Sequence, residues 1–331
     1  MRTIINQVLP IHSISKKITL GLLSIALLLG TSIHAQQKYI NILTGGTSGV
    51  YYPLGVALSQ IYTKIPDTKI SVQATKASVE NLNLLQQGKG ELAFVLGDAV
   101  ADAWAGNVEA GFKTKLDRLR AIAAIYPNYI QIIANKESGI KTLADLKGKR
   151  VSVGAAKSGT ELNARAIFKA AGLSYQDFAK VEFLPYAESV ELIKNRQLDA
   201  TLQSSGLGMA AFRDLATTMP VVFIPIPEDL IKSIGSEAYA SGIIPANTYE
   251  GQTQDIPTVI ITNILVSHDK VSDEIAYQMT KGIFENLQNI QNAHSAAKDI
   301  HLEQAIKNLP IPLHTGAKRY YQEVGLIKSE L

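Results

Sequence analysis

The sequence predicts an α/β protein of two lobes joined by two crossing strands. Short apolar runs with strand character alternate with helix-like segments along almost the whole chain, a pattern typical of βαβ units and a mainly parallel sheet. Two apolar segments, 121–134 and 257–266, lack the glycine-rich turn into a helix. Each is long enough to leave one sheet and enter another, so we expect them to join two lobes. One large doubly wound sheet is the alternative.

The expected elements follow from apolar periodicity and from the turn residues that interrupt it. Strands are expected at 38–43, 69–74, 91–96, 119–125, 129–135, 150–153, 181–184, 199–203, 221–226 and 257–266. Helices are expected at 50–64, 78–87, 98–105, 159–171, 188–195, 207–217, 271–292, 295–307 and 315–324.

The two crossing segments set the expected lobe boundaries. Lobe 1 is expected to comprise residues 36–128 and 262–331, and lobe 2 residues 129–261. We expect hinges near 126–131 and 255–261, where the chain passes between the lobes. A chain of 331 residues, 46% of them hydrophobic, is large enough to give each lobe a core.

The first 35 residues have the composition of a secretory signal peptide. Lys16 and Lys17 precede the apolar run 18–29, polar residues follow, and Ala35 is a small residue at the expected cleavage point. The apolar run is short for a membrane span, which favours a cleaved signal over an uncleaved anchor. We therefore expect cleavage after Ala35 and a periplasmic location.

Charge and cysteine content exclude several kinds of partner and site. The chain has 32 basic and 29 acidic residues, and the signal segment holds three of the basic residues and none of the acidic ones. The mature chain is therefore balanced in charge. The basic pI of the full sequence comes largely from the signal segment, so it gives no support to a nucleic-acid partner. The absence of cysteine excludes a cysteine nucleophile, cysteine metal ligands and a lipid-modified cysteine at the signal junction.

Three strand-to-helix junctions are rich in small and hydroxyl residues: 44–49 (TGGTSG), 74–78 (ATKAS) and 154–160 (GAAKSGT). The start of a helix has unpaired N–H groups and a partial positive charge, and it binds an anion without a formal cation. Because the first and third junctions fall in different expected lobes, we predict that the lobes hold a carboxylate or a similar anion between them. Ordinary helix caps and turns are the alternative interpretation.

Other chemistries find little support in the sequence. The junctions lack the G-x-x-x-x-G-K-[ST] and G-x-G-x-x-G spacings of phosphate and dinucleotide loops. The G-x-S-x-G and H-E-x-x-H motifs are absent, and the histidines of the mature chain are scattered. No nucleophile and base form an evident pair, so we expect a binding protein without enzymatic activity, metal or cofactor.

The residues expected to contact the ligand lie mainly at these junctions. Gly46, Thr47 and Ser48 are expected to bind the carboxylate together with Ser158 and Thr160 from the other lobe. Further candidates in lobe 1 are Tyr52, Ser78, Asn81 and Asp98. A helix N-cap is the alternative role for Asp98.

Seven blocks in order along the chain resemble the TAXI solute receptors of TRAP transporters. The blocks are 44–53 (TGGTSGVYYP), 78–82 (SVENL), 145–154 (DLKGKRVSVG), 158–160 (SGT), 197–200 (QLDA), 244–249 (IPANTY) and 312–317 (PLHTGA). The resemblance implies a two-lobe periplasmic-binding-protein fold, type II-like, that closes on a small organic acid such as glutamate or 2-oxoglutarate. It also implies delivery to a TRAP-type membrane permease driven by an ion gradient. An enzyme on the same fold and a ligand-sensing lobe of a signalling protein are the alternatives.

The chain departs from the TAXI pattern at several positions. Ala77, Lys157 and Asn247 stand where the family tends to have glycine, and 205–208 lacks the expected proline. Lys157 is either a cation for a second carboxylate or a solvated side chain. These departures bear on which carboxylate the chain would accept.

Overall fold

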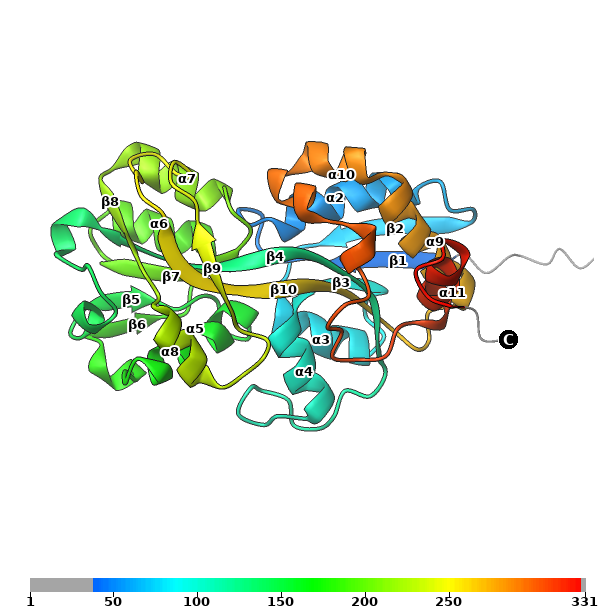
Figure 1. Cartoon of the computed structure of the whole chain (residues 1–331), viewed down its shortest axis with the longest axis horizontal. Coiled ribbons are helices and arrows are strands. Elements are labelled where there is room, and N and C mark those ends of the chain that lie inside the picture. Colours follow the sequence, from blue (N-terminus) through cyan, green and yellow to red (C-terminus); the bar gives the residue numbers. More distant parts are fainter. Residues whose placement is uncertain (1–37, 329–331) are drawn as a thin grey trace, which may run out of the picture. The chain divides into compact units, whose positions relative to one another are not determined.

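The structure, a computed structural model, describes residues 38–328, so the expected signal peptide and its cleavage at Ala35 lie outside the described residues. A single sheet of ten strands forms the centre of this part of the chain, in the order β2-β1-β3-β10-β4-β7-β5-β6, with β8 beside β4 and β9 beside β10 (Figure 1). The strands are β1 (Lys38–Leu43), β2 (Thr68–Gln73), β3 (Leu92–Leu96), β4 (Leu119–Asn135), β5 (Arg150–Ser152), β6 (Lys180–Glu182), β7 (Ala200–Ser205), β8 (Val221–Ile224), β9 (Ala240–Ile244) and β10 (Ile256–His268).

Helices cover both faces of the sheet. They are α2 (Tyr51–Tyr62), α3 (Ser78–Gln86), α4 (Gly97–Ala105), α5 (Gly159–Ala170), α6 (Tyr186–Lys194), α7 (Ala210–Thr218), α8 (Glu228–Ile234), α9 (Asp273–Glu285), α10 (Leu287–Ala293) and α11 (Thr315–Glu323). Short 3₁₀ turns are η1 (Lys136–Ser138), η2 (Ala144–Leu146), η3 (Tyr175–Asp177), η4 (Ser295–Asp299) and η5 (Leu302–Gln304).

The long strands β4 and β10 each run through both halves of the sheet and pair with different neighbours along their length. Within β10, Asn263–Val266 pairs with β3, and Ile256–Ile260 pairs with β9. Within β4, Tyr129–Ala134 pairs with β7, while most of the strand pairs with β10. Figure 1 shows these two strands passing through the middle of the sheet. The prediction of two crossing strands is confirmed, although 119–125 and 129–135 form one continuous strand rather than two.

We propose to keep the lobe boundaries expected from the sequence. Lobe 1 below denotes residues 38–128 and 262–328, and lobe 2 denotes residues 129–261. With this division, β1–β3 belong to lobe 1 and β5–β9 to lobe 2, and the boundaries fall inside β4 and β10.

Two apolar clusters make up the core, one on each face of the sheet. Successive residues of β3 alternate between them, with Leu92 and Phe94 in one cluster and Ala93 and Val95 in the other. Helices α2, α6, α7, α9, α10 and α11 contribute to the first cluster, and α3, α4, α5 and α8 to the second (Figure 1). Burial on both faces explains why these strands are continuous apolar runs in the sequence.

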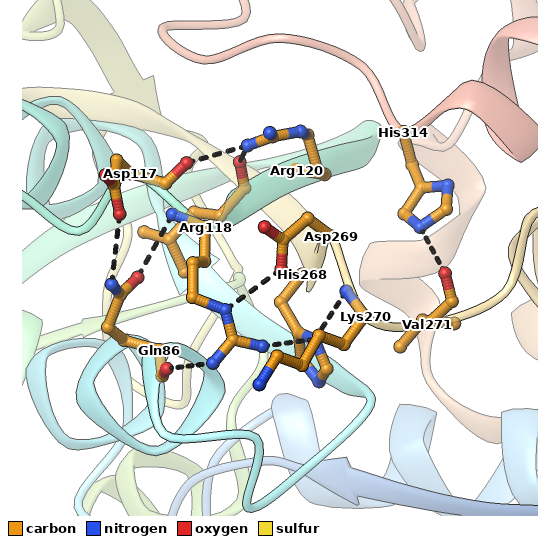
Figure 2. Close-up of polar contacts among 10 residues, drawn as sticks. Gln86, Asp117, Arg118, Arg120, His268, Asp269, Lys270, Val271 and His314 are labelled. Carbon is orange, nitrogen blue, oxygen red and sulfur yellow. Dashed lines mark hydrogen bonds and ion pairs between the residues drawn. The ribbon is translucent and has the colours of Figure 1, made fainter.

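A polar cluster fixes the start of β4 to the end of β10 in lobe 1 (Figure 2). The Arg118 guanidinium donates to Asp269 Oδ1 at 2.9 Å and to the Gln86 carbonyl at 2.8 Å, and it lies 3.5 Å from His268 Nδ1. The arginine thereby joins the end of α3 to both crossing strands. The cluster therefore fixes β4 and β10 at the ends that lie farthest along each strand from the expected hinges at 126–131 and 255–261.

Some expected elements differ in the structure. The expected helix 271–292 is broken at Asn286 into α9 and α10. The expected helix 295–307 is wrong: it consists of η4, η5 and turns, because the Ala305 carbonyl accepts a hydrogen bond from the Ala124 N–H of β4 at 2.7 Å. Helix α8 and strand β9 had not been predicted.

The described residues contain no helix that is both long enough and apolar enough to span a membrane.

Candidate functional site

A cavity of about 110 Å³ lies where the strand-to-helix junctions of the two lobes meet. It is bordered by the carboxyl end of β1, the starts of α3, α5 and α6, and the end of β7, at the edge of the sheet where ligands bind in open α/β folds. The lining residues are 45–46 and 49–51 after β1, 75–78 before and at the start of α3, Leu96, Ala155, 158–160, 185–186 and 204–205.

Two serine hydroxyls from opposite lobes offer donors to this cavity. Ser78 Oγ accepts a hydrogen bond from the Leu96 N–H at 3.1 Å, and Ser158 Oγ accepts one from the Glu161 N–H at 3.1 Å. Because each hydroxyl oxygen acts as an acceptor in these bonds, its O–H remains a donor. For Ser78, the neighbouring Tyr51 hydroxyl is an alternative acceptor.

The same two serines mark helix N-termini. Ser78 is the first residue of α3, and Ser158 is the N-cap of α5. The first N–H groups of a helix have no partner within the helix, and the helix dipole makes this end partly positive. The cavity therefore receives two positive helix ends, one from each lobe, without a buried cation.

Two partly buried tyrosines form part of the wall. Tyr51 donates to Asn263 Oδ1 at 2.6 Å and stacks on Phe94 with ring centroids 5.3 Å apart. Tyr186 donates to the Ser204 carbonyl at 2.6 Å and lies 2.6 Å from Thr160 Oγ1. Burial raises the pKa of both tyrosines, so both side chains stay neutral. They shape the cavity and add polar groups without adding charge.

The cavity is nearly free of formal charge. Among the lining residues, Lys76 is the charged one, and its side chain is exposed. Lys157 is exposed and does not line the cavity, although its carbonyl accepts the Glu80 N–H from lobe 1 at 3.2 Å. An anion in this cavity would therefore depend on neutral donors and helix ends.

The structure brings together four of the nine residues predicted for the site. Gly46, Ser78, Ser158 and Thr160 line the cavity. The other five, Thr47, Ser48, Tyr52, Asn81 and Asp98, do not.

The five remaining residues have other positions. Thr47 is exposed, and Ser48 does not cap α2, whose N-cap is Val50. Asn81 is fully buried and donates to the Thr44 and Phe94 carbonyls, which braces the interior of lobe 1.

Tyr51 lines the cavity in the place expected for Tyr52. Helix α2 starts at Tyr51, and consecutive helical residues point about 100° apart, so only one of the pair can face the cavity. Tyr186 and Ser204 had not been predicted at all. The junction before α6, Pro185-Tyr186, lacks the glycine and hydroxyl signal that marked the other junctions, and Ser204 reaches the site only through sheet pairing.

A family model described as the NMT1-like family matches residues 42–325. This chain belongs to the NMT1-like family. The description of this family names no type of transporter, so the TAXI assignment suggested by the sequence blocks stays a proposal.

Solved structures also resemble this NMT1-like chain. PhnD1 from Prochlorococcus marinus (MIT 9301), in complex with methylphosphonate, is 11% identical, with 88% of this chain and 100% of that chain covered and a TM-score of 0.53. A protein of Bordetella bronchiseptica RB50 is 18% identical, with 87% and 82% covered and a TM-score of 0.52. The alkanesulfonate-binding protein SsuA from Xanthomonas axonopodis pv. citri, bound to MOPS, is 16% identical, with 86% and 90% covered and a TM-score of 0.49.

The comparisons with the higher TM-scores confirm the two-lobe α/β fold expected from the sequence. The likeness to these structures shows the fold alone, so the expected role as a binding protein without enzymatic activity stays a proposal.

Proposed function

We propose that this chain is a periplasmic receptor that captures a small carboxylic acid between its lobes and delivers it to a membrane permease. The observation that carries the proposal is the cavity at which α3 and α5 begin, with Ser78 and Ser158 offering hydroxyl donors from opposite lobes. An anion there would link the lobes, because each lobe supplies part of its hydrogen-bonding shell.

The charge of the cavity favours a carboxylate over a phosphonate. A phosphonate group can carry two negative charges on one head, whereas each carboxylate group carries one, and the lining has no buried cation to stabilise a doubly charged head. Glutamate and 2-oxoglutarate, implied by the TAXI resemblance, are the first candidates. The ligands named for PhnD1 and SsuA, methylphosphonate and a sulfonate buffer, make phosphonates and sulfonates the alternative class.

We propose a TRAP-type permease as the partner, on the strength of the seven sequence blocks that resemble TAXI receptors. An ATP-driven permease is the alternative. Uptake of labelled acid into membrane vesicles that contain the permease separates the two. A TRAP-type partner predicts uptake that requires an ion gradient and continues without ATP, whereas uptake that requires ATP would reject it.

The ligand class is tested by calorimetric titration of the mature protein. Glutamate, 2-oxoglutarate, methanesulfonate and methylphosphonate are the probes, and the acid is recovered afterwards and analysed by mass spectrometry. We expect saturable binding of at least one carboxylate, which is recovered unchanged. Binding of methanesulfonate or methylphosphonate with no binding of either carboxylate would reject the carboxylate proposal, and a chemically altered acid would reject the receptor role.

A further inference from the structure

A buried carboxylate joins the two lobes outside the ligand cavity. Asp98 lies in the first turn of α4 in lobe 1, and its side chain is 7% exposed. Its Oδ2 accepts hydrogen bonds from two groups of lobe 2, the Asn163 amide at 2.7 Å and the Tyr239 hydroxyl at 2.9 Å. Its Oδ1 is buried and has no hydrogen-bond partner among the described residues. These bonds exist only while the lobes are together.

Hydrogen bonds connect this contact to the cavity and to a crossing strand. Asn163 Oδ1 accepts from Ser204 Oγ at 2.8 Å, and Ser204 Oγ accepts from the Asn128 amide at 2.5 Å. Ser204 lines the cavity, and Asn128 lies in β4 at the expected hinge. Asn163 therefore connects Asp98 to the cavity through Ser204 and to the expected hinge through Asn128.

Burial makes the charge of Asp98 sensitive to pH. Burial raises its pKa to about 6 from the ordinary 3.8, although the hydrogen bonds of Tyr239, the Ala99 N–H and Asn163 oppose this rise. Lobe opening would remove the lobe 2 donors and admit water, so the pKa would return toward its ordinary value. The closed arrangement therefore binds a proton more tightly than the open one.

The surroundings of Asp98 allow this titration. Asp98 borders a groove of about 690 Å³ between α4 and α5, which gives protons a route from solvent. Apart from Asp98 itself, two acidic and two basic residues line this groove. The titratable groups that interact with Asp98 are Asp102 on its own helix, Tyr239 before β9 and Tyr51 on α2. Glu109 in the following loop and Arg165 and Lys169 on α5 are the other charged residues that line the groove.

We infer that Asp98 is a proton-dependent latch between the lobes, which favours closure when neutral and opening when ionised. The consequence for the ligand rests on the proposed function. The receptor would retain its ligand in an acidic medium and release it in a neutral one. The sign follows from linkage, since the state with the higher pKa is stabilised as pH falls. The pKa is about 6 in the closed form, and a fully solvated Asp98 in the open form is taken to have the ordinary pKa of 3.8. The closed-to-open ratio is then expected to rise about tenfold from pH 7.5 to pH 5.

The test measures the distance between the lobes in the absence of any added ligand. The natural chain has no cysteine, so Lys89→Cys in lobe 1 and Gln176→Cys in lobe 2 provide two unique spin-label positions, both exposed. Double electron–electron resonance from pH 5 to pH 8 reports the populations. We expect the population of the longer distance to grow as pH rises through about 6. A population that does not change with pH would overturn the inference.

Three variants separate the latch from a general effect of pH. Asp98→Asn mimics the neutral carboxyl and should keep the short distance at every pH. Tyr239→Phe removes one donor to the ionised form and should move the transition to higher pH. Asp102→Asn makes the same charge change on the same helix but removes no bond between the lobes, so its pH dependence should resemble that of the natural chain. A natural pH profile in both Asp98→Asn and Tyr239→Phe would overturn the inference.

Failure of the latch and failure of the proposed function give different results. The distance measurement needs no ligand, so it is informative even if no carboxylate binds. Conversely, binding of a carboxylate with no pH-dependent change in the distance would leave the receptor role intact and reject the latch.

Discussion

Gly159, the first residue of α5, lies directly against Ser78, the first residue of α3. A Cβ added to Gly159 would come within 2.7 Å of both Ser78 Oγ and Leu96 Cδ1. Such distances are far below van der Waals contact, so a larger residue at 159 would force something to move. Because Gly159 belongs to lobe 2 and Ser78 to lobe 1, separation of the lobes is one movement that relieves the clash, beside a shift of the Ser78 and Leu96 side chains.

Gly159→Ala should therefore weaken ligand binding without unfolding the protein. Overpacking costs about 1–3 kcal/mol, which corresponds to a roughly fivefold to hundredfold loss of affinity if lobe separation bears the cost. Calorimetric titration with 2-oxoglutarate measures the loss, and circular dichroism checks the fold. Lys298→Ala, an exposed change far from the junctions in sequence, serves as the control and should bind as the natural chain does.

Ala77→Gly should stabilise the protein. Ala77 has φ 68° and ψ −143°, a region that is essentially restricted to glycine and costs other residues about 1–3 kcal/mol. Allowing for the greater freedom of glycine in the unfolded chain, we expect a gain of about 1 kcal/mol in the free energy of unfolding. Urea denaturation measures it.

The matched control is Ala105→Gly at the exposed end of α4, where the backbone is helical. This change should lower the free energy of unfolding by up to about 1 kcal/mol. If both glycine variants lost stability to the same degree, the backbone strain at Ala77 would be refuted.

Lys157→Gly should relieve strain of the same kind while leaving the ligand affinity unchanged. Lys157 has φ 65°, and it meets lobe 1 through its carbonyl rather than its side chain. We expect a higher melting temperature and a Kd for 2-oxoglutarate within about twofold of that of the natural chain, a difference of less than 0.5 kcal/mol. A loss of tenfold or more in both Lys157→Gly and Lys157→Ala would instead show that the ammonium group holds a second carboxylate.

His314 should make the protein less stable as pH falls. Its Nδ1 accepts from the Gly316 N–H at 3.2 Å and caps α11, and its Nε2 lies 3.0 Å from the Val271 carbonyl (Figure 2). This arrangement requires a neutral ring with the proton on Nε2, and burial lowers its pKa. A lowered pKa means that the unfolded chain takes up the proton first, so the contribution of His314 is lost as pH falls below about 6.5.

The variant His314→Asn tests this sign, because asparagine also caps helices but does not titrate. The decrease in the free energy of unfolding between pH 7 and pH 5 should become smaller by about 1 kcal/mol. His301→Asn at an exposed position should leave that decrease unchanged. Equal slopes in the natural chain and His314→Asn would refute the role of His314.

The strand and helix pattern of the sequence was sufficient for most of the fold because the central strands, such as β3 and β4, are buried on both faces. Continuous apolar runs separated by junctions such as 44–49 were recognisable without tertiary information. The prediction for segment 295–307 was wrong for a physical reason. Its apolar spacing suits a helix, but the Ala305 carbonyl accepts a hydrogen bond from the Ala124 N–H of β4. Strand β9 escaped prediction because Gly242, which admits the close contact with Ile260, weakens the strand signal.

The candidate site could be located from the sequence but not completed. The junctions gave Ser78 and Ser158, whereas the choice of Tyr51 over Tyr52 depended on the residue at which α2 begins. Ser204 depended on pairing between strands far apart in the chain.

The backbone conformation explains the three positions at which this chain lacks the glycine of the TAXI pattern. Ala77, Lys157 and Asn247 all have positive φ, at 68°, 65° and 63°. These are conformations in which glycine is favoured, which explains why the resembling family tends to have glycine there.

The most direct test of the central claim is calorimetric titration of 2-oxoglutarate into Ser78→Ala, Ser158→Ala, the double variant and Thr47→Ala. The two serines line the cavity from opposite lobes, whereas Thr47 is an exposed hydroxyl of the neighbouring glycine loop that does not line it. A hydrogen bond to a charged group contributes about 1.5–3 kcal/mol, so each serine variant should bind roughly tenfold to a hundredfold more weakly and the double variant more weakly still. Thr47→Ala should bind as the natural chain does. If the natural chain bound 2-oxoglutarate and the folded serine variants bound it equally well, the carboxylate would not be held between these two serines.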